Sequence, residues 1–165
     1  MDASLETIRQ QIVQLLPRLR RYAIALTGST ADGDDLVQDT VERALKNLHA
    51  WEPGTRLDSW MFRIAKNRFI DQRRAAKRRP VSGSDVLESC DVAHDGERMI
   101  EARSSLRTVS EALQNLPDEQ RHAVALVLVD GRSYKDAADI LEIPIGTLTS
   151  RISRARESLA AALGC

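Results

Sequence analysis

The chain has 165 residues, of which 42% are hydrophobic, 29% are charged and only 4% are aromatic. These values suit one globular domain or two small helical ones and exclude a disordered tail protein; with so few aromatics the core must use Leu, Ile, Val and Ala, which predicts an all-α fold. The formal net charge of zero argues at first against a nucleic-acid-binding protein, because such proteins usually carry an excess of basic residues.

The N-terminal region predicts a helical hairpin. Apolar residues recur every three to four positions from residue 5 to 26, which is typical of an amphipathic helix, and Pro17 is expected to kink or restart it. Gly28 ends this helix. Asp32 is placed to cap a second helix whose apolar residues extend to Leu48.

The second predicted helix is acidic on its exposed side. Asp35, Gln38, Asp39 and Glu42 share that side at helical spacing, and their negative charge repels DNA. The charges could serve solubility alone, but this face is better suited to a protein partner.

A third helix is predicted to follow the break at residues 51–55, which reads Trp-Glu-Pro-Gly-Thr. Thr55 and Asp58 have the spacing of a capping box, so this helix should begin near Arg56. One face is apolar and the other basic, the basic residues being Arg63, Lys66, Arg68, Arg73, Arg74 and Lys77. A basic face is often only solvated; the nearby aromatics could stack on unpaired bases, although their spacing places most of them in the core.

Residues 80–96 are rich in turn formers and lack periodicity, which predicts a flexible linker. The chain should therefore consist of two small helical domains, residues 1–79 and 97–165.

The C-terminal domain opens with two predicted helices. A three-to-four-residue apolar repeat from Met99 to Leu116 predicts a helix with a core-facing stripe, and Pro117 suits the start of the next helix. That second helix should continue the core with Val124, Val127 and Leu128.

The last two predicted helices have the form of a helix-turn-helix. Ser133 and Asp136 have capping-box spacing and open a short helix over residues 134–141; the final helix runs from about residue 146 to 163. Its outer face carries Thr149, Ser150, Arg151, Ser153 and Arg154. Such side chains can reach base edges or phosphates in a major groove, although an ordinary hairpin with a solvated face is the alternative.

The sequence contains no pattern typical of catalysis or metal binding. There is no phosphate-binding glycine loop, HExxH motif or nucleophile elbow, and the three histidines and two cysteines are isolated from one another. No signal peptide and no apolar run of the roughly 20 residues that a spanning helix needs is present. We expect a cytoplasmic protein that is not an enzyme, has no cofactor or small-molecule substrate and does not insert into membranes.

Three segments, in this order, resemble the extracytoplasmic-function (ECF) subfamily of bacterial sigma factors. Residues 34–44 (DDLVQDTVERA) resemble the helix that grips the polymerase clamp. Residues 51–60 together with 67–71 resemble the loop and helix that read the −10 promoter element. Leu116-Pro117, Ser133-Tyr134 and residues 144–156 resemble the domain that reads the −35 element. The similarity covers nearly the whole chain.

The resemblance implies a set of residues for each surface. The polymerase-facing residues would be Asp35, Leu36, Gln38, Asp39 and Glu42. The −10 element would be met by Trp51, Pro53, Gly54, Thr55, Arg56, Arg63, Lys66, Asn67, Arg68, Asp71 and Arg74. The −35 element would be met by Ser133, Tyr134, Thr147, Thr149, Ser150, Arg151 and Arg154.

The function implied is that of an alternative sigma factor, which binds core RNA polymerase and promoter DNA and is controlled by an anti-sigma factor wedged between its domains. A sigma-like decoy that sequesters an anti-sigma factor is the main alternative. A plain helix-turn-helix repressor would not explain the tryptophan loop or the acidic helix. Two positions depart from the family: Thr149 replaces a frequent basic residue, and Glu142 stands where Gly is frequent. A left-handed backbone at Glu142 would cost about 1 kcal/mol or more.

Overall fold

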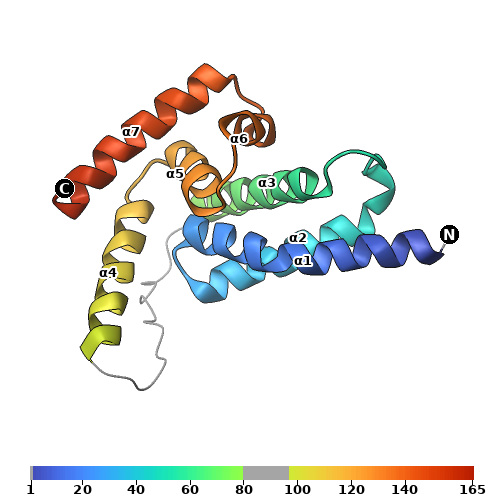
Figure 1. The fold of residues 1–165 in the computed structure, drawn as a ribbon, viewed down its shortest axis with the longest axis horizontal. Helices are drawn as coiled ribbons and strands as arrows, with labels where there is room; N and C mark the ends of the chain where they lie inside the picture. Colours follow the sequence, from blue (N-terminus) through green and yellow to red (C-terminus); the bar gives the residue numbers. More distant parts are fainter. Residues whose placement is uncertain (1, 80–96) are drawn as a thin grey trace.

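The protein is described by a computed structural model that covers residues 2–79 and 97–165, and within these ranges it is all helical (Figure 1). The N-terminal half contains α1 (Asp2–Thr27), α2 (Thr30–Lys46), the short 3-10 turn η1 (Leu48–Ala50) and α3 (Leu57–Arg78). The C-terminal half contains α4 (Glu97–Gln114), α5 (Asp118–Val124), the π-helical segment η2 (Ala125–Val129), α6 (Tyr134–Leu141) and α7 (Ile145–Leu163). The all-α prediction is confirmed. The predicted linker, residues 80–96, lies outside the described residues, so the domain boundary stays a prediction.

Two of the predicted helix caps are wrong and one is confirmed, whereas the start of α3 at Leu57 agrees with the one predicted near Arg56. Ser29 caps α2, because its side chain accepts a hydrogen bond from the backbone N–H of Asp32, the residue predicted to be the cap. The capping box at Thr55 is absent: α3 begins at Leu57, and the Thr55 hydroxyl donates to the Glu52 carbonyl. For α6, the Ser133 side chain accepts from the Asp136 N–H at 3.1 Å, as predicted.

Pro17 does not restart the first helix, because α1 is a single helix of 26 residues with Pro17 inside it. A proline removes one intrahelical hydrogen bond and crowds the preceding turn. Here Ile12 on one side of Pro17 and Leu19 on the other are buried in the same core. Packing of one continuous apolar stripe therefore outweighs the local cost.

The α1–α2 hairpin closes around a buried glycine. A Cβ atom on Gly33 would lie 2.6 Å from Cγ1 of Ile24 and 3.1 Å from the Ile24 backbone. Only a residue without a side chain lets the two helices approach this closely. The closely packed hairpin fixes which face of α2 remains available to a partner.

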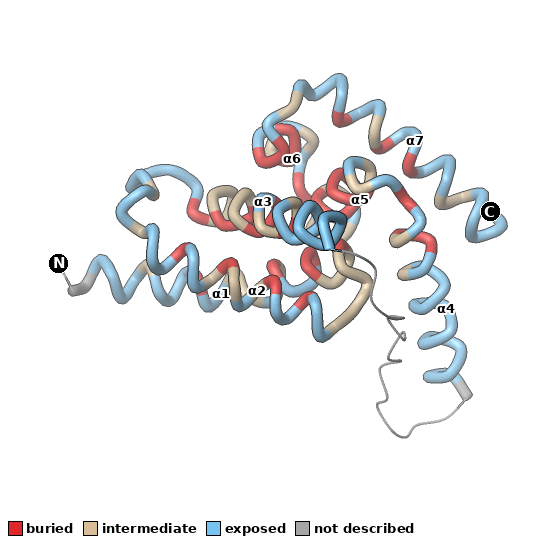
Figure 2. Tube along the Cα trace, turned by 180° about the vertical axis from the view of Figure 1, so that it is seen from behind, coloured by how far each residue is buried: buried red, intermediate tan, exposed pale blue. Residues whose placement is uncertain are grey.

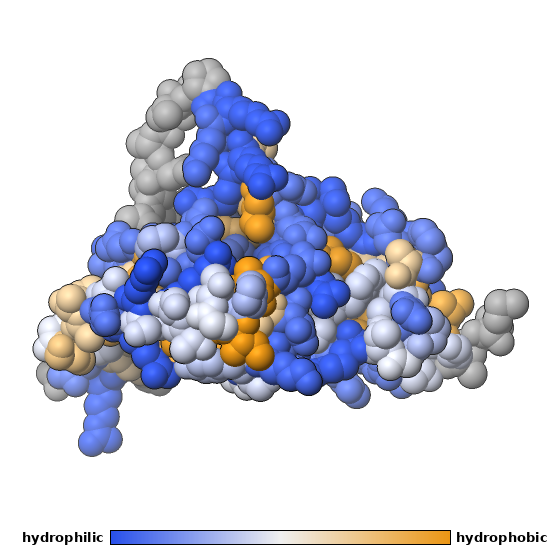
Figure 3. Space-filling view, turned by 90° about the horizontal axis from the view of Figure 1, so that it is seen from above, coloured by the Kyte–Doolittle hydropathy of each residue, from blue (hydrophilic) through white to orange (hydrophobic). Residues whose placement is uncertain are grey.

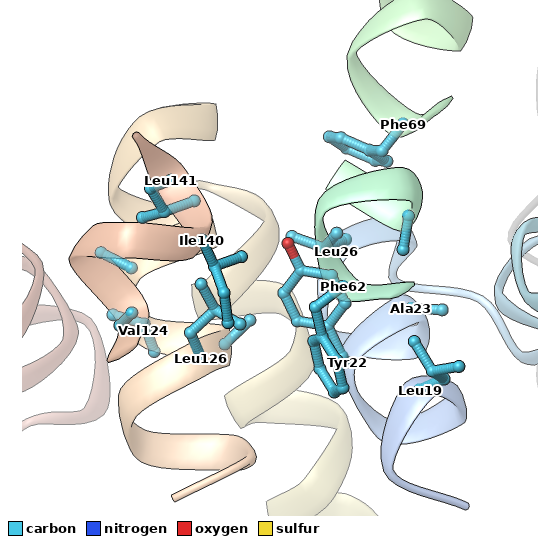
Figure 4. Close-up of a cluster of buried hydrophobic side chains, with 14 of the residues drawn as sticks. Leu19, Tyr22, Ala23, Leu26, Phe62, Phe69, Val124, Leu126, Ile140 and Leu141 are labelled. Carbon is cyan, nitrogen blue, oxygen red and sulfur yellow. The ribbon is translucent and has the colours of Figure 1, made fainter. Parts of the chain in front are cut away.

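The two halves of the chain share one hydrophobic core (Figure 4). On one side of it lie residues of α1 and α3: Leu19, Tyr22, Leu26, Phe62 and Phe69. Facing them are residues of α5, η2 and α6: Val124, Leu126, Ile140 and Leu141. Burial of this apolar area in both halves holds the helix-turn-helix against the N-terminal helices.

Part of the core predicted for the C-terminal half is exposed. In α4 only the last turns pack inward, with Leu113 and Leu116 buried, whereas Met99, Leu106 and Val109 are 43%, 69% and 40% exposed. The helix extends past α1 and α7, the helices that it contacts, so its first turns have no neighbour among the described residues (Figures 1 and 2). Leu128, also predicted to be core, is exposed as well, on the outer side of the π-helical segment.

No helix within residues 2–79 and 97–165 has both the length and the apolar content needed to cross a membrane.

Candidate polymerase and promoter surfaces

The acidic face predicted for α2 is present on the surface. Asp35, Gln38 and Glu42 are exposed, and the Gln38 side-chain amide donates to the Glu42 carboxylate at 3.3 Å. Asp39 is half-buried, because it forms an ion pair with Arg68 of α3. Leu36 is fully buried, so its side chain belongs to the core and supports this face from beneath; the structure corrects its placement among the partner-facing residues.

The loop between η1 and α3 combines a fixed tryptophan with an exposed tip. Trp51 packs against the core, and its indole Nε1–H is buried without a hydrogen-bond partner among the described residues. Pro53, Gly54 and Thr55 are exposed, and Gly54 adopts φ +91°, which only glycine adopts readily. The loop therefore presents an exposed turn close to a large aromatic ring.

The basic residues of α3 are split between two directions. Arg63, Lys66, Asn67 and Arg74 share one face of the helix by their spacing. Arg68 points to α2, where it pairs with Asp39. Residues predicted for two different partners, DNA and polymerase, are thus joined in one ion pair. Asp71 and Arg74 are exposed near the end of the helix.

The helix-turn-helix of α6 and α7 has the predicted form, including its left-handed turn. Glu142 has φ 57° and ψ 44°, the conformation that favours glycine. The outer face of α7 carries exposed Thr147, Thr149, Ser150 and Arg154. The hydroxyls of Thr149 and Ser150 donate to carbonyls one turn earlier, at 2.9 Å and 3.1 Å, which leaves their oxygens free to accept hydrogen bonds.

The remaining predicted −35 residues lie at the edges of this face. Arg151 pairs with Glu119 of α5 at 3.2 Å. Ser133 is exposed at the start of α6, and Tyr134 is half-buried against the core. Seen from the side of α6 and α7, the surface is mostly hydrophilic with small separate apolar patches (Figure 3). Such a surface suits contact with a polar, charged duplex.

A ladder of ion pairs joins the two halves beside the core. Arg132 is buried and donates to Asp58 of α3 and to Asp130, each at 2.8 Å; its guanidinium lies 4.6 Å from the centre of the Phe62 ring. Arg18 of α1 donates to both carboxylate oxygens of Asp130. Burial alone would raise the pKa of Asp58, but hydrogen bonds from Arg56 and the charge of Arg132 lower it to about 2. These charges are compensated only while the halves remain together.

A buried histidine lies where α1, α3 and α5 meet. His122 Nδ1 forms a 3.0 Å hydrogen bond with the Tyr22 hydroxyl, and the Phe69 ring packs edge-on against the imidazole. Its Nε2 is buried without a partner among the described residues. Burial lowers the pKa of His122 to about 4, so the side chain is neutral at physiological pH.

Sequence reasoning missed the residues that connect the halves. Arg18 and Asp130 are 112 positions apart, and Arg132 and Asp58 are 74 apart, so no local spacing could pair them. The one available signal was that His122 directly precedes the apolar run of residues 123–129, where a buried polar side chain needs a partner.

Comparisons with known proteins place the chain in a family. A family model described as the Sigma2 domain of PhyR matches residues 12–66, and one described as Sigma-70, region 4 matches residues 106–159. The ECF RNA polymerase sigma factor EcfG of Rhodopseudomonas palustris is 36% identical over 158 residues, which are 96% of this chain and 86% of that protein. SigM of Mycobacterium tuberculosis, also an ECF RNA polymerase sigma factor, is 35% identical over 89% of this chain and 72% of its own length.

Two solved structures share the fold and come from complexes. The sigma factor RpoE of Bartonella quintana, solved with the anti-sigma factor NepR, superposes with a TM-score of 0.76 at 32% identity, covering 96% of this chain and 98% of that one. CnrH, solved with the cytosolic domain of CnrY, has a TM-score of 0.73 at 27% identity, covering 97% and 89%. With such identity over nearly its whole length, the chain belongs to the ECF RNA polymerase sigma factors.

Proposed function

We propose that this protein acts in the cytoplasm as an alternative sigma factor, which binds core RNA polymerase and directs it to promoters. The observation that carries the proposal is the coexistence of three surfaces in one chain: the acidic face of α2, the loop and basic face of α3, and the Arg-bearing face of α7. EcfG and SigM, the two relatives described above, are RNA polymerase sigma factors, which supports the same assignment.

We assign one partner to each of the three surfaces. We assign Asp35, Gln38, Asp39 and Glu42 to the polymerase, since an acidic face repels DNA but complements a basic protein surface. The tryptophan loop and α3 would hold the melted −10 strand, where stacking and a pocket must offset the few kcal/mol that an extruded base costs. The outer face of α7 would read or brace the −35 duplex.

An anti-sigma factor is the partner proposed for the free protein. RpoE and CnrH, both similar to this chain, were solved in complex with such a factor or with a cytosolic domain of another protein. The match to the Sigma2 domain of PhyR keeps the decoy as the second candidate. A decoy would need neither a polymerase-facing acidic surface nor a basic strand-binding surface, and this chain has both.

Transcription in vitro tests the proposal directly. Core polymerase with and without the protein would transcribe sheared genomic DNA of the source organism, and sequencing the RNA 5′ ends would locate the starts. We expect protein-dependent starts preceded by shared −10 and −35 elements. No starts above those of core alone would contradict a sigma factor and favour the decoy.

A pair of acidic variants tests the assignment of α2. Asp35→Ala should weaken binding to core polymerase in a titration by about five- to tenfold, because Asp35 is exposed and makes no ion pair within the described residues. Glu6→Ala on the exposed side of α1 is the matched control and should leave core binding unchanged. Equal affinities for the two variants would move the polymerase surface away from α2.

A further inference from the structure

Helix α6 covers part of the surface assigned to the −10 strand. The Arg56 guanidinium donates to the Asp136 carboxylate at 2.7 Å. About two turns further along the chain, Arg63 of α3 donates to the backbone carbonyl of Asp139 at 3.2 Å, and Lys66 pairs with the Glu142 carboxylate at 3.3 Å. We call these three contacts the latch. All three basic residues belong to the predicted −10 set.

The acceptors in the latch resemble a nucleic-acid backbone chemically. Each is an oxygen, and two of them are carboxylates, which take the same charge-assisted hydrogen bonds from Arg and Lys as phosphate oxygens do. The same donors cannot serve Asp136 and Glu142 and a DNA strand together. Arg63 also has a buried Nε–H without a hydrogen-bond partner among the described residues. With α6 packed against α3, which we call the closed form, one donor of Arg63 is therefore unsatisfied.

Glu142 indicates that the latch does more than fill space. Glycine would adopt the left-handed backbone conformation of Glu142 without strain. Glutamate instead brings a carboxylate to Lys66, whose ammonium-bearing side chain is only 8% exposed. A cation so far removed from water needs an anion beside it, and the strained residue supplies one from the other half of the chain.

The latch covers one promoter surface and leaves the other open. On α7, Thr149, Ser150 and Arg154 remain exposed, whereas Lys66 on α3 is buried. The ion-pair ladder of Arg18, Asp58, Asp130 and Arg132 holds the same two halves together on the adjacent side.

We propose that α6 is an intramolecular competitor for the −10 strand, so that Arg63, Lys66 and the Arg56 donor bound to Asp136 become available to DNA only after α6 leaves α3; the other side of the Arg56 guanidinium stays paired with Asp58 of α3. The proposal rests on the assignment of α3 to the −10 strand made above. Binding to the open form then carries the cost of opening, and the apparent affinity for a single strand is reduced by the fraction of chains that are open.

Strand binding by the full chain without polymerase tests this. The probe is a fluorescent oligothymidine single strand at low salt, followed by anisotropy. The variant Asp136→Asn/Glu142→Gln should bind it about three- to thirtyfold more tightly than the unaltered chain, since two ion pairs of the closed form are lost. The charge-matched control Glu101→Gln/Glu111→Gln, on the exposed face of α4, should stay within about twofold of the unaltered chain once the general effect of charge is included.

Two further variants keep the test decisive. Glu142→Gly removes one latch carboxylate and relieves the left-handed strain. A circular dichroism spectrum and an unfolding curve like those of the unaltered chain would show that it folds, and a smaller gain in affinity is expected. Adding Arg56→Gln to the double variant should cancel much of its gain. Equal gains for latch and control variants would overturn the proposal. If the unaltered chain gives no transcription with core polymerase but Asp136→Asn/Glu142→Gln still binds the strand more tightly, the sigma-factor assignment is refuted and the competition by α6 is not.

Discussion

At the scale of single residues, Gly33 sets the distance between α1 and α2. Because a Cβ there would lie 2.6 Å from Ile24 Cγ1, we expect Gly33→Ala to lower the free energy of unfolding by about 1–3 kcal/mol. Gly146, inside α7, has no atom within 4 Å of an added Cβ. Gly146→Ala should therefore be neutral or stabilise by up to about 1 kcal/mol. Urea denaturation of both variants measures the difference, and equal losses would contradict the close crossing.

His122 makes the stability of the folded chain depend on pH. Its pKa is lowered to about 4, first by burial and then by the charges of Lys66, Arg121 and Arg151, with Asp118 opposing. Between pH about 6.5 and about 4 the unfolded chain binds the proton that the folded chain refuses, so stability is complete above this window and falls as the pH is lowered through it. The loss should be on the order of 3 kcal/mol.

Thermal unfolding between pH 7 and 4 measures this effect. His122→Gln cannot take up the proton and can still bond the Tyr22 hydroxyl, so its curve should be flatter in this window. The exposed His49→Gln serves as the control and should follow the unaltered chain. The contribution of Asp58, whose pKa is lowered to about 2, is lost only in the separate window below about pH 3.8. A drop confined to that lower window would exclude His122 as the cause.

At the scale of elements, Arg121 ties the ends of two helices together. Its guanidinium donates to the carbonyls of Leu113, Gln114 and Leu116 at the end of α4, at 2.7–2.9 Å, and to Leu26 of α1 at 3.0 Å. The Leu26 and Gln114 carbonyls lie at helix ends, which leave carbonyls without intrahelical partners, and Leu116 follows α4; the Leu113 carbonyl also accepts from the Leu116 N–H at 3.2 Å. One buried side chain thus satisfies both helix ends.

Replacing Arg121 should therefore cost more than an ordinary surface charge. Arg121→Met keeps the length of the side chain but strands buried carbonyls, and we expect a loss of about 2–4 kcal/mol in the free energy of unfolding. Arg107→Met in α4 removes only an exposed pair with Glu111 and should change stability by less than about 0.5 kcal/mol. Similar losses for both variants in chemical denaturation would show that the carbonyls find other partners.

At the scale of the whole molecule, the shared core makes the two halves one cooperative unit. Leu126 and Ile140 of the C-terminal half are fully buried against residues of α1 and α3. We expect one calorimetric transition, with equal calorimetric and van't Hoff enthalpies. Two resolved transitions would mean that the halves unfold separately, as the independent domains predicted from the sequence would do.

Local patterns predicted the elements well and their long-range assembly poorly. Helical periodicity and turn residues were sufficient for the bounds of α6 and the form of the helix-turn-helix, because those signals lie within a few residues of each other. The same periodicity misplaced Met99 and Leu106 in the core. An apolar stripe on one helix does not reveal how much of its length the neighbouring helices cover. The contacts of Arg132 and Lys66 depend on how the halves dock, which no local spacing records.

The π-helical turn at Ala125–Val129 determines the direction in which the Asp130 side chain points, and Asp130 accepts hydrogen bonds from Arg18 and Arg132. In it the Asp130 N–H reaches back five residues to the Ala125 carbonyl, so the segment holds one residue more than a regular turn would. Removing exposed Leu128 should turn it into an ordinary helical turn and rotate Asp130 by about 100°. Asp130 would then face away from Arg18. One extra residue in this turn is therefore needed for the ion pair between Arg18 and Asp130 that joins the two halves.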